Sequence, residues 1–120
     1  MAQRITRAKR KIRVARIPYR VPRDAELPAR LRGVLATVFL VFNEGYLASS
    51  GETLVRTDLC GEAVRLGRLL RDLMPDEPEV AGLLALMLLV EARSAAREAG
   101  GVLVPLGEQD RRLWRRDLVD

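Results

Sequence analysis

"VAGLLALMLLV", residues 80–90, is the most informative stretch for the fold class, because none of its residues carries a charged or polar side chain. A helix needs about 20 such residues to cross a bilayer, so this run is too short for a membrane segment. It instead predicts a central helix that other helices wrap. We expect this helix to cover residues 77–98, with Pro75 ending the element before it.

Two amphipathic stretches lie before this central helix. Apolar residues recur at spacings of three and four over residues 25–48 and 53–74, which predicts two more helices separated by "SSGE", residues 49–52. Asp24 stands at the expected N-cap of the first of them. The expected inward-facing residues are Leu27, Leu31, Val34, Leu35, Val38, Val41, Phe42 and Tyr46, then Leu59, Ala63, Leu66, Leu70 and Leu73. The sequence therefore predicts an all-α fold with a three-helix core, in which residues 53–98 resemble one hairpin of a helix-pair solenoid.

The C-terminal part is expected to be shorter and less regular. "GGVLVPL", residues 100–106, predicts a glycine turn and a short extended segment. "GEQDRRLWRRDLV", residues 107–119, predicts a C-terminal helix that begins near Asp110. The apolar residues expected to dock this helix are Leu113, Trp114 and Leu118.

Charge divides the chain unevenly. Residues 1–23 hold nine Arg or Lys and no acid, whereas residues 24–120 hold twelve basic and sixteen acidic residues. The result is a charge of +9 followed by −4, so the N-terminal arm is the part suited to a polyanion. Phosphate binding is the favoured explanation, and a membrane surface or an acidic protein are the alternatives.

The arm itself reads as a helix followed by a linker. Ile5, Ala8 and Ile12 are spaced by three and four residues, which predicts a basic amphipathic helix over residues 1–16. The two prolines within residues 17–24 predict a linker, and residues 25–120 follow as a helical domain.

"NEGYLASSG", residues 43–51, places polar groups at the end of an apolar helix. Glu44 and Tyr46 suggest an acid and a proton donor, but a structural corner is the favoured hypothesis, in which Gly45 lets backbones approach and Asn43 bonds nearby main-chain groups. Such a corner can also shape a protein-interaction surface.

The residue inventory argues against catalysis. The chain has no histidine and a single cysteine, Cys60, which we expect to be a buried apolar residue without a base to activate it. The carboxylates at positions 44, 58, 62 and 91 lack the Glu-x-x-His pairs of a di-iron bundle. We therefore expect no enzyme activity, no cofactor and no metal. We expect Asp58 or Glu62 to pair with Arg65 or Arg93 between helices.

Several blocks of the sequence resemble one family. "QRITRAKRKIR", residues 3–13, resembles the end of the helix-turn-helix recognition helix in region four of bacterial extracytoplasmic-function sigma factors. Further blocks resemble, in order, the segment that follows region four in the subgroup with a C-terminal tetratricopeptide-like extension. These blocks are "IPYRVP" (17–22), "VFLVFNEGY" (38–46), "RTDLCGEAVRL" (56–66), "PDEPEVAGLLALMLL" (75–89) and "EQDRRLW" (108–114).

The resemblance implies that the complete protein binds the RNA polymerase core and promoter DNA and initiates transcription. The chain begins within the recognition helix in this comparison, so we expect a fragment that does not initiate transcription alone. The residues that the resemblance places at DNA are Gln3, Arg4, Thr6, Arg7, Lys9, Arg10, Lys11 and Arg13. Because the N-terminal residues of a recognition helix read the bases, this tail is expected to position the protein more than to specify sequence.

The helical domain is expected to serve protein interaction or regulation, and its apolar helices offer a surface for self-association. The alternative is a stand-alone helical adaptor whose basic tail binds an acidic partner. We expect a cytoplasmic location and no membrane contact, because the chain shows no secretory signal and no long apolar segment.

Overall fold

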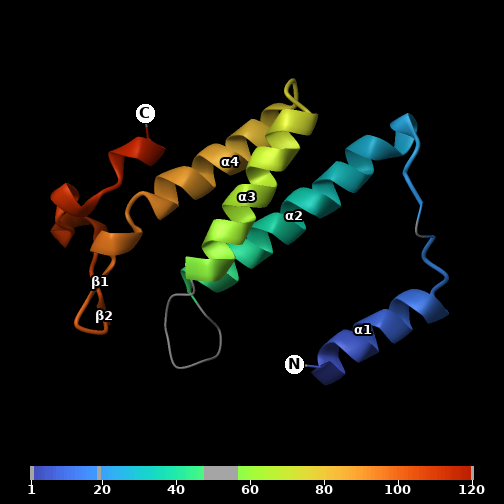
Figure 1. Ribbon diagram of the computed structural model, residues 1–120, viewed down its shortest axis with the longest axis horizontal. Coiled ribbons are helices and arrows are strands. Elements are labelled where there is room, and N and C mark those ends of the chain that lie inside the picture. The colour runs from blue at the N-terminus through green and yellow to red at the C-terminus, as the bar shows by residue number, and fades with distance from the viewer. Residues whose placement is uncertain (1, 19, 48–56, 120) are drawn as a thin grey trace. The chain divides into compact units, whose positions relative to one another are not determined.

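The computed structural model describes residues 2–18, 20–47 and 57–119. The described residues form four α-helices, several 3-10 turns and one two-stranded sheet, so the all-α prediction is confirmed (Figure 1). Contacts within the chain divide it into two compact units, residues 1–30 and residues 31–120.

The first unit contains helix α1, Ala2–Val14, at the predicted position. Every α1 side chain from Gln3 onward is exposed. The helix closes at Arg16, whose φ of 49° is left-handed, and the Ile17 N–H donates to the Ile12 carbonyl at 3.2 Å. A left-handed residue that turns the chain in this way is a common helix C-terminus.

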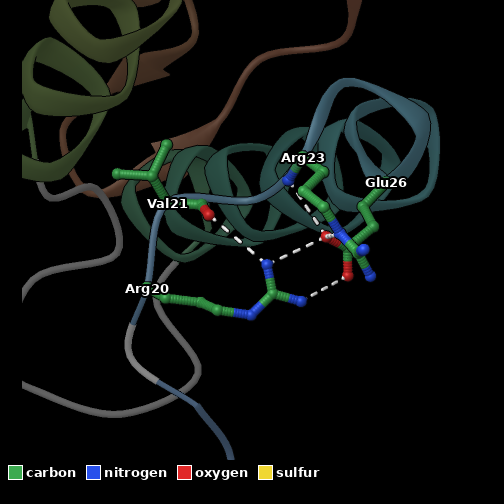
Figure 2. A network of polar contacts seen from close by, with 4 residues as sticks. All are labelled: Arg20, Val21, Arg23 and Glu26. Atoms are coloured by element: carbon green, nitrogen blue, oxygen red, sulfur yellow. Dashed lines mark hydrogen bonds and ion pairs between the residues drawn. The ribbon is translucent and has the colours of Figure 1, made fainter.

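A cluster of polar contacts holds the linker to the start of the next helix (Figure 2). The Arg20 guanidinium forms a two-pronged ion pair with Glu26, at 2.7 and 3.0 Å, and the Arg23 backbone N–H donates to the same carboxylate at 3.0 Å. The predicted N-cap at Asp24 is wrong. Asp24 is instead the first residue of a 3-10 turn, Asp24–Glu26, whose N-cap is Arg23, and the Glu26 N–H donates to the Arg23 carbonyl at 2.8 Å.

The core of the second unit is formed by three helices: α2, Leu27–Tyr46, from residue 31 onward; α3, Thr57–Leu73; and α4, Pro78–Glu91. They match the three predicted helices, although the expected start of α3 falls in part outside the described residues. The helices meet at a cluster of buried residues, Val38 and Phe42 from α2, Cys60, Ala63 and Val64 from α3, and Met87 from α4. Of the other expected inward positions, Val34 and Leu73 are exposed.

Helices α3 and α4 lie side by side and approach closely at Gly67 (Figure 1). A Cβ atom placed on this buried glycine would lie 2.8 Å from Met87 Cε and 3.3 Å from Leu84 Cδ1. The absence of a side chain at Gly67 therefore leaves the space that the ends of the Met87 and Leu84 side chains occupy.

Helix α4 ends at Glu91, one to two turns before the predicted end at residue 98. A 3-10 turn, Ser94–Ala96, follows, and β1, Glu98–Ala99, pairs antiparallel with β2, Val102–Leu103. Gly100 and Gly101 join the strands with φ of 60° and 81°. The predicted glycine turn and extended segment are thus confirmed, since a two-residue hairpin turn requires positive φ.

The predicted C-terminal helix is wrong, because three separate 3-10 turns take its place: Leu106–Glu108, Arg111–Leu113 and Arg116–Leu118. The backbone becomes extended between them at Gln109 and Trp114. The Arg115 N–H also donates to the Ala92 carbonyl at 2.8 Å, a tertiary bond that a continuous helix would not make. Trp114 and Leu118 are half-buried as expected of docking residues, but Leu113 is exposed.

Helix α4, which the sequence predicts to be the central helix, is not covered on every side. Val80 and Met87 are buried, whereas Leu86 and Leu89 are 47% and 51% exposed. The prediction of a fully wrapped helix is therefore wrong for one face of α4. Within the described ranges, no helix has the length and apolar character needed to cross a membrane.

Candidate nucleic-acid and protein interfaces

Helix α1 carries all eight residues that the resemblance places at DNA. All are exposed, and six are cations: Arg4, Arg7, Lys9, Arg10, Lys11 and Arg13. Arg4, Arg7 and Lys11 follow one another at spacings of three and four, so they share one face of the helix. Like charges at these spacings repel and destabilise an isolated helix, and bound phosphates would relieve that repulsion.

The same helix has an apolar side that nothing buries within its unit. Ile5 and Ile12, which lie on one side of the helix, are 53% and 51% exposed. Helix α1 has 13 residues, and helices of that length are marginal in water without packing. Its apolar side is therefore a second surface, distinct from the cationic one.

The corner at the end of α2 receives a buried arginine. The Arg97 guanidinium lies 3.1 Å from the centroid of the Tyr46 ring, and Arg97 Nη1 donates to the Tyr46 carbonyl at 2.9 Å. The Tyr46 ring also stacks on Phe42, with centroids 6.3 Å apart. Of the other predicted corner residues, Gly45 is buried, Glu44 is half-buried and Asn43 is exposed. The contact fixes the end of α2 to the segment after α4.

Arg97 is the one charged residue that is buried in the described part of the chain, and sequence reasoning missed it. The sequence predicts Arg97 at the end of a helix. The spacing of residues around Arg97 does not indicate a contact with Tyr46, which lies 51 residues earlier. Burial lowers the pKa of Arg97, and the neighbouring Tyr46 and Cys60 groups act in the opposite direction. A partner with π electrons and a carbonyl acceptor is what a buried guanidinium needs.

Two further titratable groups lie near Arg97. Burial raises the pKa of Glu91, and the charges of Arg115 and Arg97 oppose that rise. Burial, reinforced by Glu91, raises the pKa of Cys60 to about 11, and its Sγ donates to the Phe42 carbonyl at 3.7 Å. A thiol with this pKa stays protonated at neutral pH, which is the form that does not attack electrophiles.

The predicted pairing of Glu62 with Arg65 is confirmed, but the pair lies within α3 and does not join two helices. The Glu62 carboxylate contacts Arg65 Nη2 at 2.6 Å, and both residues lie exposed on α3, three positions apart. The pair lowers the pKa of Glu62. Asp58 is exposed in the first turn of α3, and Arg93 is half-buried in the turn after α4, where its charge helps to lower the pKa of Arg97.

The second unit also carries an apolar groove that sequence reasoning did not locate. Helices α2 and α4 line it, and its volume is about 510 Å³. The lining residues are Leu35, Ala36 and Phe39 from α2 and Pro78, Glu79, Gly82, Leu83 and Leu86 from α4. Among the described side chains, no group of three or more Cys, Asp or Glu lies close enough together to hold a metal ion.

The comparisons with known proteins agree with the division of the chain into residues 1–30 and 31–120. Residues 30–120 match a family of unknown function, DUF6596. The chain belongs to this family. It is also 50% identical, over 120 residues, to the uncharacterized protein R00370 of Rhizobium meliloti (strain 1021). That match covers 99% of the chain but only 28% of the relative's length. No solved structure matches the chain.

Proposed function

We propose that this chain is a segment of a bacterial RNA polymerase sigma factor of the extracytoplasmic-function group. In this proposal α1 is the tail of a helix-turn-helix recognition helix that contacts promoter DNA. The helical domain after it serves protein interaction or regulation, without catalysis, in the cytoplasm. The observation that carries the proposal is α1 itself, with six exposed cations and no acid in 13 residues.

The arrangement of the cations suits phosphates better than base edges. They lie along the whole helix, which is how side chains follow a DNA backbone and fix the register of a protein on the duplex. The exposed apolar side of α1, with Ile5 and Ile12, suits packing against the other helices of a helix-turn-helix. A cationic helix that binds phosphates without other helices beside it does not need an apolar side.

The lengths of the related proteins support a segment of a longer protein. Nearly three quarters of the Rhizobium meliloti relative lies outside the match, while the matched part is 50% identical over 120 residues. The family match begins at residue 30, so α1 and the linker lie outside the family's shared domain. This division is what the proposal requires of a DNA-binding element joined to a separate helical extension.

The first test is the salt dependence of DNA binding by the chain, measured by fluorescence anisotropy with a labelled duplex. With four phosphate contacts, affinity should fall about 100-fold between about 50 and 200 mM salt. A variant with Arg7→Ala, Arg10→Ala and Lys11→Ala should lose most of this slope. The matched control removes three exposed arginines elsewhere: Arg65→Ala, Arg68→Ala and Arg112→Ala. A flat salt response, or equal losses in both variants, would contradict a DNA-binding α1.

The second test addresses transcription. The full-length relative, mixed with core RNA polymerase, should give a promoter-dependent transcript, and the same three α1 substitutions at the matching positions should reduce it. Absence of a transcript from every template, together with protein partners retained after residues 1–23 are deleted, would favour the stand-alone adaptor.

A further inference from the structure

The outward face of α4 is apolar over most of its length. Gly82, Ala85, Leu86 and Leu89 are all exposed, and they recur at spacings that keep them on one side of the helix. The opposite side holds the buried Val80 and Met87. A contiguous exposed apolar face of this kind marks a site of protein association.

This face has a shape that can receive side chains. Its Gly82 and Leu86 line the groove between α2 and α4, next to Phe39, which is 38% exposed. A Cβ placed on Gly82 would meet no atom within 4 Å, so the surface is open there. The surface formed by α2 and α4 thus offers two projecting side chains, Phe39 and Leu86, beside Gly82, which has no side chain.

Opposite charges stand at the two ends of the face. Glu79 lies in the first turn of α4, and Arg93 lies in the turn directly after the helix. Each is seven residues from Leu86 in the sequence, and for Glu79 this is about 10 Å along the α4 axis. Within α4, Glu79, Gly82, Leu86 and Leu89 follow one another at steps of three, four and three, which is the repeat that pairs helices along a seam. Arg93 follows Leu89 by four residues but lies two residues beyond the end of α4.

We infer that this face binds a second copy of the chain, with the two α4 helices antiparallel about a twofold axis at Leu86. That symmetry brings Glu79 of each copy opposite Arg93 of the other, and Leu86 against Leu86. It also sets Leu89 of each copy near the open position at Gly82 of the other. The interface is isologous, which means that both copies use the same surface. Both partners of every contact must therefore lie on this one seam, and they do.

The chemistry of the groove favours a protein copy over a nucleic acid. Its lining contains seven apolar or glycine residues and one carboxylate, and no cation. A phosphate backbone would be repelled there, whereas a second apolar seam would be desolvated together with it. The inference does not depend on the proposed DNA contacts of α1, which use other residues.

The main test measures the mass of the chain in solution by sedimentation velocity, from about 1 to 200 µM, the range in which weak homodimers form. The chain should shift from monomer to dimer, and Leu86→Glu should weaken the dimer at least tenfold by placing two carboxylates on the axis. Leu69→Glu is the matched control, because Leu69 is also 47% exposed but lies on α3. It should leave the dimer intact.

The variant Gly82→Leu separates an effect on dimerisation from an effect on folding. The substitution removes an exposed helical glycine, which favours the folded state, yet it fills the open position that the partner's Leu89 needs. Circular dichroism should show an unchanged or higher melting temperature while the dimer is weakened. A dimer that tolerates Gly82→Leu would overturn the proposed seam.

A charge exchange tests the antiparallel register. Glu79→Arg and Arg93→Glu should each weaken the dimer several-fold, because each puts like charges opposite one another. The double variant should restore it, because the exchange returns opposite charges to each pair. A chain that stays monomeric over the whole range, a dimer lost in Leu69→Glu, or a double variant that fails to recover would overturn the inference.

Discussion

Helices α1 and α3 have similar sequence patterns and opposite structural roles. Both place apolar residues at spacings of three and four, yet every described side chain of α1 beyond Ala2 is exposed, while α3 buries Cys60, Ala63 and Val64. Their charges differ as well. Helix α1 carries cations alone, whereas α3 mixes carboxylates and arginines and pairs Glu62 with Arg65.

The comparison teaches that amphipathic spacing predicts a helix but does not tell what covers its apolar side. In α3 that side meets α2 and α4, and packing supplies the stability that a short helix lacks on its own. In α1 the apolar side remains open within its unit, and the cationic side is the proposed contact for a polyanion. The four predictions below test this contrast, beginning with the largest effect.

Phe42→Ala should destabilise the chain most. Phe42 is 2% exposed and contacts the cluster shared by α2, α3 and α4, so its removal should cost about 3–5 kcal/mol of unfolding free energy. Ile12→Ala on α1 is the counterpart, and it should stay within about 0.5 kcal/mol because Ile12 is half exposed. Urea unfolding followed by circular dichroism measures both. If Ile12→Ala were as costly as Phe42→Ala, the apolar side of α1 would be buried and the contrast would fail.

Arg97→Ala should have the next largest effect, about 1–3 kcal/mol. It removes the guanidinium from the Tyr46 ring and leaves the Tyr46 carbonyl without that donor. Arg97→Lys should recover only part of the loss, because an ammonium cannot stack flat on the ring while donating to the carbonyl. Arg112→Ala, at a highly exposed ion pair, is the control and should be nearly neutral. Equal stability of Arg97→Ala and Arg112→Ala would show that the corner contact contributes nothing.

The helices of the core could be predicted from the sequence because their signals are local. The apolar period predicted the starts of α2 and α4 to within a few residues, and two adjacent glycines predicted a turn, which the structure shows to join two paired strands. Burial of Cys60 followed in the same way from its place on an apolar helix face. Each of these features depends on residues close in the chain.

The features that could not be predicted depend on distant partners. Helix α4 ends at Glu91, and six residues later Arg97 donates to the Tyr46 carbonyl. The C-terminal segment is divided into separate turns, and the Arg115 N–H between two of them donates to the Ala92 carbonyl. The N-cap is a local exception: the turn begins one residue earlier than predicted, with Arg23 as its N-cap, and the Arg23 N–H donates to Glu26. Spacing alone also could not show which side of the apolar run 80–90 would stay exposed.

Gly67→Ala and Gly82→Ala should differ in sign. Both glycines lie in helix interiors, where alanine is favoured by about 1 kcal/mol. At Gly82 the new methyl meets no atom within 4 Å, so the full gain is expected. At Gly67 it would lie 2.8 Å from Met87 Cε, and Met87 is fully buried, so the core must shift and the gain should be lost or reversed. Melting temperatures at concentrations low enough to keep the chain monomeric give the difference. Equal gains at both sites would show that α3 and α4 do not approach closely at Gly67.

The smallest expected effect concerns the protonation of Glu91. Because burial raises its pKa in the folded chain, the protonated carboxyl stabilises the fold at low pH, and this contribution is lost as pH rises through the folded pKa. Glu91→Gln resembles the protonated form, so its stability relative to the parent chain should increase from about pH 4 to pH 7.

Asp110→Asn is the control of opposite sign. Arg112 lowers the pKa of Asp110, so its ionised form stabilises the fold above the unfolded pKa and that contribution is lost as pH falls. This variant should therefore become less stable, relative to the parent, as pH rises to about 4, the ordinary pKa of an aspartate, and should show little further change up to pH 7. Parallel pH profiles for the two variants would mean that the surroundings of Glu91, with Arg97 and Arg115 near it, are as open to water as those of Asp110. The segment after α4 would then lack the buried contacts that set the second unit apart from α1.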